Sequence, residues 1–238
     1  FMNMNTLKEN ILSKPLPTHI GIILDGNGRW ATKRLLPRNL GHKKGVETLG
    51  EIALEAKKIG IPYLTVFAFS TENWSRPKDE VDYLLNQIKE HYHKGLKKLI
   101  EEKIKVKFIG SKDNLPNDIL LIMEDVENTS KSFNELTLTI AFNYGSKQEI
   151  LNACNNIIKE SDIDDNLFKS YLYTKDLPDV DLIIRTSGEM RLSNFLLYQS
   201  SYAELYFPKT LWPDFHKKEL YLAINEYQNR NRRFGGLK

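Results

Sequence analysis

A short polar turn that directly follows an apolar run is the first place in the chain where chemistry could occur. Residues 25–30 read DGNGRW, after the run 19–24. The two glycines would let backbone N–H groups approach an oxyanion, and Arg29 would add a two-pronged phosphate donor. Asp25 would be repelled by bound phosphate unless a cation such as Mg²⁺ lay between them. A plain tight turn and a helix N-cap explain the same residues about equally well.

Similar polar stretches follow other apolar runs. Residues 70–77 (STENWSRP) carry hydroxyl, carboxylate, amide, aromatic and basic groups, although a loop with a packed tryptophan is the simpler interpretation. Residues 185–193 hold two arginines that could flank one small anion. Glu204 lies in an otherwise apolar segment, where a buried carboxylate is costly. It either pairs with an arginine or coordinates a metal.

The elements that would position these stretches alternate along the chain. The apolar patterns predict strands and helices in turn. This order indicates one α/β domain over residues 1–238, a mostly parallel central sheet flanked by helices on both faces, with Phe1 ahead of Met2 as an added residue. Ligands of such sheets bind beyond the carboxyl ends of the strands, where the polar stretches fall. The predicted strands are 19–24, 64–69, 105–109, 136–142, 182–185 and 204–207, and the predicted helices are 45–59, 80–100, 116–133, 146–159 and 217–227.

Composition excludes several classes of protein. Thirty-four Lys and Arg against 31 Asp and Glu leave a net charge of +3, too even for a dedicated nucleic-acid binder. A hydrophobic content of 41% is too high for a disordered chain. The single cysteine, Cys154, excludes an internal disulfide and a cysteine metal cluster, and it favours a reducing cytosol. Because no apolar run approaches the roughly 20 residues of a membrane span and the first ten residues do not resemble a signal peptide, a soluble cytoplasmic protein is expected.

The positive charges are unevenly distributed. No acidic residue occurs from residue 26 to residue 46, which holds six lysines and arginines. Further basic clusters lie at residues 185–191 and 230–233. Each cluster alone is more simply a solvated surface, but a fold that unites them would concentrate positive potential around an anionic ligand.

Five segments resemble the signature regions of the cis-prenyltransferases. They are residues 19–31, 41–45, 67–77, 181–189 and 202–207, and the resemblance extends from His19 to Gly236. It implies a homodimer of α/β subunits with an apolar tunnel. It also implies extension of farnesyl diphosphate by successive isopentenyl diphosphates, which would make the cis double bonds of a lipid carrier for cell-wall glycans such as peptidoglycan.

The resemblance also implies roles for individual residues. Asp25 corresponds to an essential Mg²⁺-binding aspartate, and Glu204 to a second metal ligand. Met190 stands where some members have a histidine, so the metal candidates are these two carboxylates. Asn73 corresponds to a proposed proton acceptor, although an amide is a poor base. The tail at 230–238 carries an Arg-x-Gly element (Arg233 to Gly235) that would reach a neighbouring subunit.

The remaining implied residues bind substrate. The allylic diphosphate cradle comprises Gly26, Asn27, Gly28, Arg29, Trp30, Arg38 and His42. The loop that closes over the substrates comprises Ser70, Thr71, Glu72, Asn73, Trp74 and Arg76. The isopentenyl diphosphate site comprises Arg185, Arg191, Leu192 and Ser193.

A growing isoprenoid needs an apolar wall, because each five-carbon unit gains about 4 kcal/mol on leaving water, at roughly 0.8 kcal/mol per methylene. The apolar stripe from residue 81 to residue 99 and the strand 136–142 are the expected lining, with plain core nearly as well supported. In the family that the sequence resembles, a small residue such as Ala68 is compatible with a long product. Because such an apolar product does not enter water readily, the enzyme is expected to contact a membrane transiently, as a peripheral protein at the inner face of that membrane.

Two other functions are compatible with parts of the sequence. A non-catalytic partner subunit would lack Asp25, Asn27, Arg29 or Arg185, all of which are present. A basic RNA-binding module would place exposed aromatic residues among its arginines, whereas these arginines lie near carboxylates. Activity of the purified single chain and a binding assay with and without Mg²⁺ discriminate between the three functions.

Overall fold

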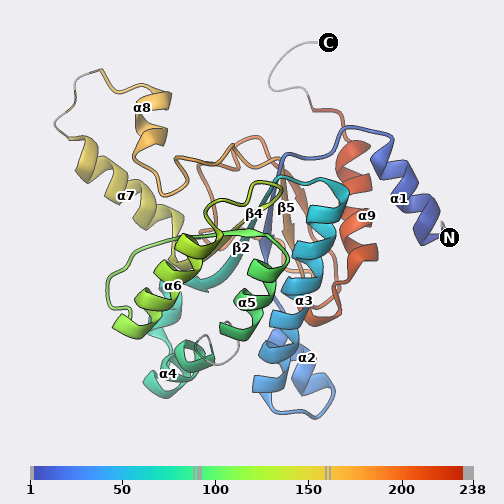
Figure 1. The fold of residues 1–238 in the computed structure, drawn as a ribbon, viewed down its shortest axis with the longest axis horizontal. Helices are drawn as coiled ribbons and strands as arrows, with labels where there is room; N and C mark the ends of the chain where they lie inside the picture. Colours follow the sequence, from blue (N-terminus) through green and yellow to red (C-terminus); the bar gives the residue numbers. More distant parts are fainter. Residues whose placement is uncertain (1–2, 88, 90–92, 159, 161, 233–238) are drawn as a thin grey trace.

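Six parallel strands form one sheet at the centre of the computed structural model, which describes residues 3–232 apart from 88, 90–92, 159 and 161 (Figure 1). The order across the sheet is β3-β4-β2-β1-β5-β6, and every neighbouring pair is parallel. This confirms the predicted α/β class. The strands are β1 (His19–Ile23), β2 (Tyr63–Ser70), β3 (Lys105–Ile109), β4 (Thr137–Tyr144), β5 (Leu182–Arg185) and β6 (Glu204–Tyr206).

Helices pack mainly on one face of the sheet. In Figure 1, α3, α5 and α6 lie in front of the strands, with α9 and α1 beside them. The helices are α1 (Met4–Leu12), α2 (Asn27–Lys33), α3 (Arg38–Ile59), α4 (Lys78–Gln87), α5 (His93–Glu101), α6 (Asn117–Ser130), α7 (Ser146–Ile157), α8 (Asp165–Ser170) and α9 (Lys217–Gln228). Two short 3₁₀ helices, η1 (Thr71–Ser75) and η3 (Trp212–Asp214), complete the described elements. None of the described helices has the length and apolar content needed to cross a bilayer.

The other face is covered partly by irregular chain, which differs from the expectation of helices on both faces. Phe195 and Leu196, from the segment between β5 and β6, are fully buried and pack with Ile23, Tyr144 and Ile183. Burial on both faces explains why every residue of β1 is buried and why its apolar residues do not alternate with exposed polar ones.

The strand order reverses at β1. The chain passes from β1 to β2 on one side, whereas β5 is on the other side of β1 and continues outward to β6. Loops that leave the carboxyl ends of β1 and β5 therefore diverge, and such a divergence opens a crevice in parallel sheets. The turn at 25–30 and the loop at 186–193 both border this crevice.

Several helix predictions were wrong in extent. The expected helix at 45–59 begins seven residues earlier, at Arg38. The expected helix at 80–100 overlaps α4 and α5, and residues 88 and 90–92 between them lie outside the described residues. Neither α1, α2 nor α8 was predicted. The terminal Arg-x-Gly element and Phe1 lie outside the described residues.

The short helix α2 is held in place by its packing on α3. A Cβ atom at Gly41 would lie 2.0 Å from the backbone oxygen of Asn27, and one at Gly45 would lie 2.3 Å from the Asn27 side-chain oxygen. Glycine at both positions lets the two helices approach closely. This approach fixes the turn at the end of β1 against α3.

Candidate functional site

A cavity of about 660 Å³ opens at the carboxyl ends of β1, β2 and β5. It gathers most of the polar residues predicted from the sequence, although they come from segments far apart in the chain. The predicted residues that line it are Asp25, Gly26, Asn27, Gly28, Arg38, His42, Ser70, Glu72, Asn73, Arg76, Arg185 and Ser193.

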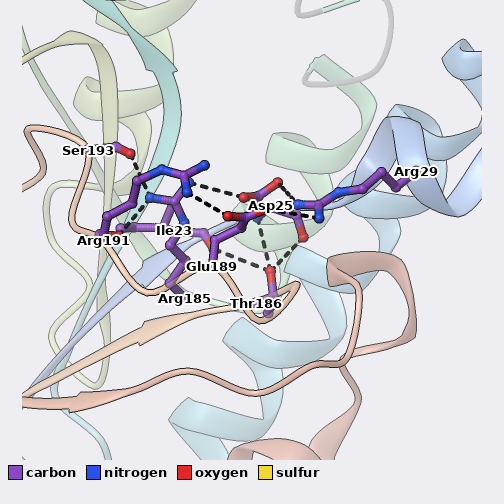
Figure 2. A network of polar contacts seen from close by, with 8 residues as sticks. All are labelled: Ile23, Asp25, Arg29, Arg185, Thr186, Glu189, Arg191 and Ser193. Atoms are coloured by element: carbon purple, nitrogen blue, oxygen red, sulfur yellow. Dashed lines mark hydrogen bonds and ion pairs between the residues drawn. The ribbon is translucent and has the colours of Figure 1, made fainter.

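Asp25 lies between two arginines in this cavity (Figure 2). Its Oδ1 accepts from Arg29 Nη2 at 3.0 Å, and its Oδ2 accepts from Arg185 Nη2 at 3.1 Å. Thr186 Oγ1 accepts the Asp25 backbone N–H at 3.0 Å and donates to the Asp25 carbonyl at 2.6 Å. The carboxylate is thus fixed at the end of β1 by contacts to the loop that follows β5.

Arg185 is the most deeply placed cation of the site, with 6% of its surface exposed. Its Nη1 donates to the carbonyl of Arg191 at 2.7 Å and to Ser193 Oγ at 2.6 Å. A buried guanidinium requires anionic and hydrogen-bonding partners to offset its lost hydration. Asp25 is its carboxylate partner here.

Glu189 extends the network beyond Asp25. It accepts from Arg29 at 3.1 Å and from Arg191 at 2.5 Å. The hydrogen bond from Arg191 and the charges of both arginines lower the pKa of Glu189, which keeps it ionised. The result is a row of alternating charges, three arginines with two carboxylates between them, that carries a net positive charge beside the cavity.

Some buried polar atoms of the cavity have no hydrogen-bond partner within the described part of the chain. Among them are Asn27 Oδ1 and Arg185 Nε. An unsatisfied buried polar atom costs about 1–3 kcal/mol. Arg185 Nε can only donate, which suits an anion, and Asn27 Oδ1 can only accept, which suits a cation.

The 3₁₀ helix η1 brings the second polar stretch to the cavity. Asn73 Oδ1 accepts the backbone N–H of Ser70 at 3.0 Å, which closes the turn. Glu72 Oε1 accepts from Asn194 Nδ2 at 2.8 Å. Burial would raise the pKa of Glu72, but hydrogen bonds from Asn194 and neighbouring groups lower it, so Glu72 is ionised.

Asn194 is a cavity residue that the sequence did not identify. It has a positive φ of 65°, and its amide also donates to Gln148 at 3.0 Å. Through Glu72, it connects the loop after β5 to the loop after β2. A left-handed asparagine has no distinct sequence signal outside a recognised turn.

Six predicted substrate-binding residues do not line the main cavity. One of them, Arg29, borders a smaller adjoining pocket. Trp30 points to η3, where its indole donates to Asp214 at 2.7 Å. Trp74 donates to Asn143 at 2.7 Å and packs against Phe69. The sequence placed these indoles in the right segments but could not give their direction. The other five residues are Trp30, Thr71, Trp74, Arg191 and Leu192.

Glu204 is not brought to Asp25 within one described chain, and its role as a second metal ligand stays a prediction. Glu204 begins β6 and is in register with Leu182, which is in register with Ile20. Asp25 lies five residues beyond Ile20, about 16 Å further along the strand direction. Glu204 instead pairs with Arg230 at 2.9 Å.

The apolar wall of the cavity also differs from the prediction. Among the described residues of the expected lining, only Leu84 borders the cavity, whereas Val81 and Leu85 belong to the core and no residue of β4 lines it. Ala68 does line the cavity as expected. The other apolar lining residues are Ile23, Leu24, Val46, Leu49, Phe67, Phe69 and Trp212. Val46 and Leu49 follow His42 at helical spacing, and this spacing could have predicted that they share its face of the helix and line the cavity.

Comparisons with known proteins agree with this geometry. The family model described as "Putative undecaprenyl diphosphate synthase" matches residues 23–235. The isoprenyl transferase of Thermotoga maritima is 50% identical over 93% of this chain and 98% of its own. The isoprenyl transferase of Streptococcus mutans is 47% identical over 97% of each chain.

Two solved structures share the fold. Lavandulyl diphosphate synthase from Lavandula x intermedia, in complex with dimethylallyl diphosphate, matches with a TM-score of 0.88 and 34% identity over 92% of this chain and 98% of the other. A probable undecaprenyl diphosphate synthase from Campylobacter jejuni matches with a TM-score of 0.78 and 33% identity over the same shares. With its site geometry, its fold and these likenesses, the chain belongs to the undecaprenyl diphosphate synthase family of cis-prenyltransferases and is an isoprenyl transferase.

Proposed function

We propose that this enzyme extends farnesyl diphosphate by successive cis condensations with isopentenyl diphosphate to make undecaprenyl diphosphate, the lipid carrier precursor for peptidoglycan and other cell-wall glycans. The observation that best supports this proposal is that one cavity has the Asp25–Arg185 ion pair on one wall and the apolar residues Ala68, Phe67 and Leu49 on another. A charged head and a hydrocarbon tail are the two parts of an allylic diphosphate. The cavity offers each part a matching surface.

The proposed condensation makes specific demands on the protein. The bond between the allylic carbon and its diphosphate oxygen breaks, and the electron pair leaves with the diphosphate. The double bond of isopentenyl diphosphate then forms a new carbon–carbon bond to that allylic carbon, and a proton leaves the adduct to regenerate a double bond. Negative charge grows on the leaving group, so donors that already point into the cavity lower the barrier. Arg38 and the backbone N–H groups at Gly28 and Arg29 would serve the leaving diphosphate.

Mg²⁺ fits the acceptors of this cavity as a proposed cofactor. Hard Mg²⁺ is usually held by one or two carboxylates and the substrate's phosphates. Asp25 supplies one carboxylate, and Asn27 adds a buried amide oxygen without a partner among the described residues. The described residues contain no group of three metal-binding side chains, which suits an ion held chiefly through the diphosphate. When bound, the ion would neutralise the departing diphosphate.

Asn73 is better suited to positioning than to proton transfer. Its side-chain oxygen is engaged by the Ser70 backbone N–H, and an amide has almost no basicity. Its Nδ2 remains a donor for a phosphate oxygen or for water. We therefore propose that Asn73 orients a phosphate group and that the proton goes to diphosphate or solvent.

Replacement of Asp25 by asparagine tests this function. Asp25→Asn keeps the shape of the side chain and removes the charge, so turnover should fall by roughly 10²–10³, the usual effect of losing one such electrostatic group. The assay combines purified chain, farnesyl diphosphate, labelled isopentenyl diphosphate and Mg²⁺. Mass analysis of the lipid gives the product length.

The matched control is Asp176→Asn. Asp176 pairs with Lys107 at 2.8 Å on the surface, away from the cavity, so its loss should leave turnover unchanged. Near-normal activity of Asp25→Asn would overturn the assignment. Absence of activity in the unmodified single chain would favour the non-catalytic partner subunit. The RNA-binding alternative gains little support, because the site's arginines are paired with carboxylates.

We also propose that the enzyme is a homodimer. Leu151 of α7 and Ile158, which caps the carboxyl end of this helix, are seven residues apart and face the same side, and they are 63% and 76% exposed. A second copy would cover this apolar face. Light scattering should give twice the chain mass, and Leu151→Asp with Ile158→Asp should give the monomer mass. A double variant that keeps the dimer mass would place the interface elsewhere.

A further inference from the structure

We propose that residues 32–40, the tip that joins α2 to α3, dock the enzyme onto an anionic phospholipid bilayer. The inference rests on the proposed function in one respect, because a long isoprenoid product belongs in a bilayer. The location of the contact is argued from the structure alone. The following paragraphs refer to residues 32–40 as the docking tip.

The docking tip exposes leucines that no protein contact explains. All of its residues are exposed, and Leu35 is 95% exposed, more than the other large hydrophobic side chains of the described chain. Two other leucines of the docking tip, Leu36 and Leu40, are 37% and 40% exposed. Leu35 also has a φ of +55°, a left-handed conformation that disfavours residues with a side chain. A leucine that is both strained and exposed lacks a structural role in the isolated chain.

The charges around these leucines favour an anionic surface. Lys33 and Lys43 are exposed and make no ion pair with any residue that the structure describes, whereas Arg34 pairs with Asp214. Lys43 and Leu40 are three residues apart on α3 and share a face. Leucines rimmed by lysines insert among the headgroups of an anionic bilayer. A purely apolar protein partner would not account for the lysines.

The position of the docking tip suits transfer of a lipid. Figure 1 shows the α2–α3 connection protruding at the end of the molecule where α2 leaves the sheet. Arg38 belongs to the docking tip and lines the cavity, so the surface borders the site. A bilayer held there would receive an apolar chain close to where it is made.

Vesicle co-sedimentation with the Leu35→Gly variant tests the inference. Glycine adopts a positive φ without strain, so this variant keeps the fold while removing the apolar side chain. Binding to vesicles of equal parts phosphatidylcholine and phosphatidylglycerol should weaken about tenfold, which corresponds to ~1.4 kcal/mol. Lys33→Glu with Lys43→Glu should weaken it by at least as much, at about fivefold for each lysine lost. Binding of the unmodified enzyme should also fall at high salt.

Two control variants lie in α6 and at its carboxyl-terminal cap, away from the docking tip. Leu121, 58% exposed, changes to alanine, and the exposed Lys131 changes to glutamate. Both controls should bind vesicles as the unmodified enzyme does. Equal binding of Leu35→Gly and the unmodified enzyme would overturn the inference, as would equal binding of the unmodified enzyme to pure phosphatidylcholine vesicles. A change of mass in light scattering on Leu35→Gly would also overturn it, by making the docking tip a contact between copies.

The proposed function and this inference can fail separately. Vesicle binding is measured without substrates, so it holds even if the condensation assay fails. Condensation measured in detergent solution should be unchanged in Leu35→Gly, because Leu35 does not line the cavity. Loss of vesicle binding together with unchanged activity in detergent supports the docking tip. Loss of both in Leu35→Gly would contradict it.

Discussion

Individual side chains show how far sequence patterns reach. Asp25 and Arg185 were both predicted at strand ends, and the sheet brings them to 3.1 Å because β1 and β5 are neighbours. Asn194 was missed, since its contact with Glu72 spans 122 residues of chain and depends on a left-handed backbone. Trp74 was placed in the correct loop but faces Asn143. Motifs locate a segment, whereas the direction of a side chain depends on packing.

Ala68 should limit product length. A register shift between Phe67 and Phe69 interrupts the alternation of β2, and Ala68 and both phenylalanines line the cavity. Ala68→Leu adds three carbons to the apolar wall, so the hydrocarbon should meet an obstacle earlier and the product should be shorter. Mass analysis of the lipid products measures this. Ala68→Ser, of nearly unchanged volume, should leave the length distribution as it is, and an unchanged length in Ala68→Leu would move the growing chain to another wall.

Elements were predictable where their apolar pattern was long and were missed where packing creates them. The sequence shows one continuous period from 80 to 100 because α4 and α5 both turn apolar residues to the same core. Helix α2 contains a glycine and lacks an apolar period, so its sequence alone predicts a loop rather than a helix. It is helical because α3 offers it a surface at Gly41 and Gly45.

Gly41 should be essential to this packing. In Gly41→Ala the new Cβ would lie 2.0 Å from the Asn27 backbone oxygen, which cannot move without shifting α2. The free energy of unfolding should fall by about 3 kcal/mol, the upper end of overpacking effects. Urea denaturation measures it. Gly50→Ala in the same helix meets no atom within 4 Å and should gain about 0.5–1 kcal/mol. Equal effects at both positions would contradict the close approach.

For the whole molecule, the order of element types indicated a parallel sheet, but strand order was not predictable. Adjacency of β1 and β5 depends on contacts between residues more than 150 positions apart. The same long-range packing buries a polar cluster between β4, α7 and the segment after β5. Glu149 is fully buried there, accepting from Tyr144 at 2.5 Å and from Gln199 at 3.0 Å. Its environment was not evident from sequence.

Glu149 should make global stability fall as pH rises. Burial raises the pKa of Glu149 above 4.5, with the hydrogen bonds from Tyr144 and Gln199 opposing the shift. Between the unfolded and folded pKa values the folded state holds a proton that the unfolded chain has released, so its contribution to stability is full below about pH 4.5 and is lost as pH rises through the folded pKa. Denaturation of the unmodified enzyme and Glu149→Gln from pH 4 to pH 8 measures it. The free energy of unfolding of the unmodified enzyme, relative to that of Glu149→Gln, should fall as pH rises. A difference that stays constant with pH would show that the pKa of Glu149 is not shifted.

The cavity at the reversal of strand order has walls from separate stretches of the chain. The loops after β1 and β5 provide its charged end, whereas β2, α3 and α4 provide most of its apolar side. Substitutions in one stretch leave the other untouched. After gene duplication, the apolar wall could therefore change while the residues that bind the diphosphate stay the same. One ancestral enzyme can in this way give rise to enzymes whose products differ in length.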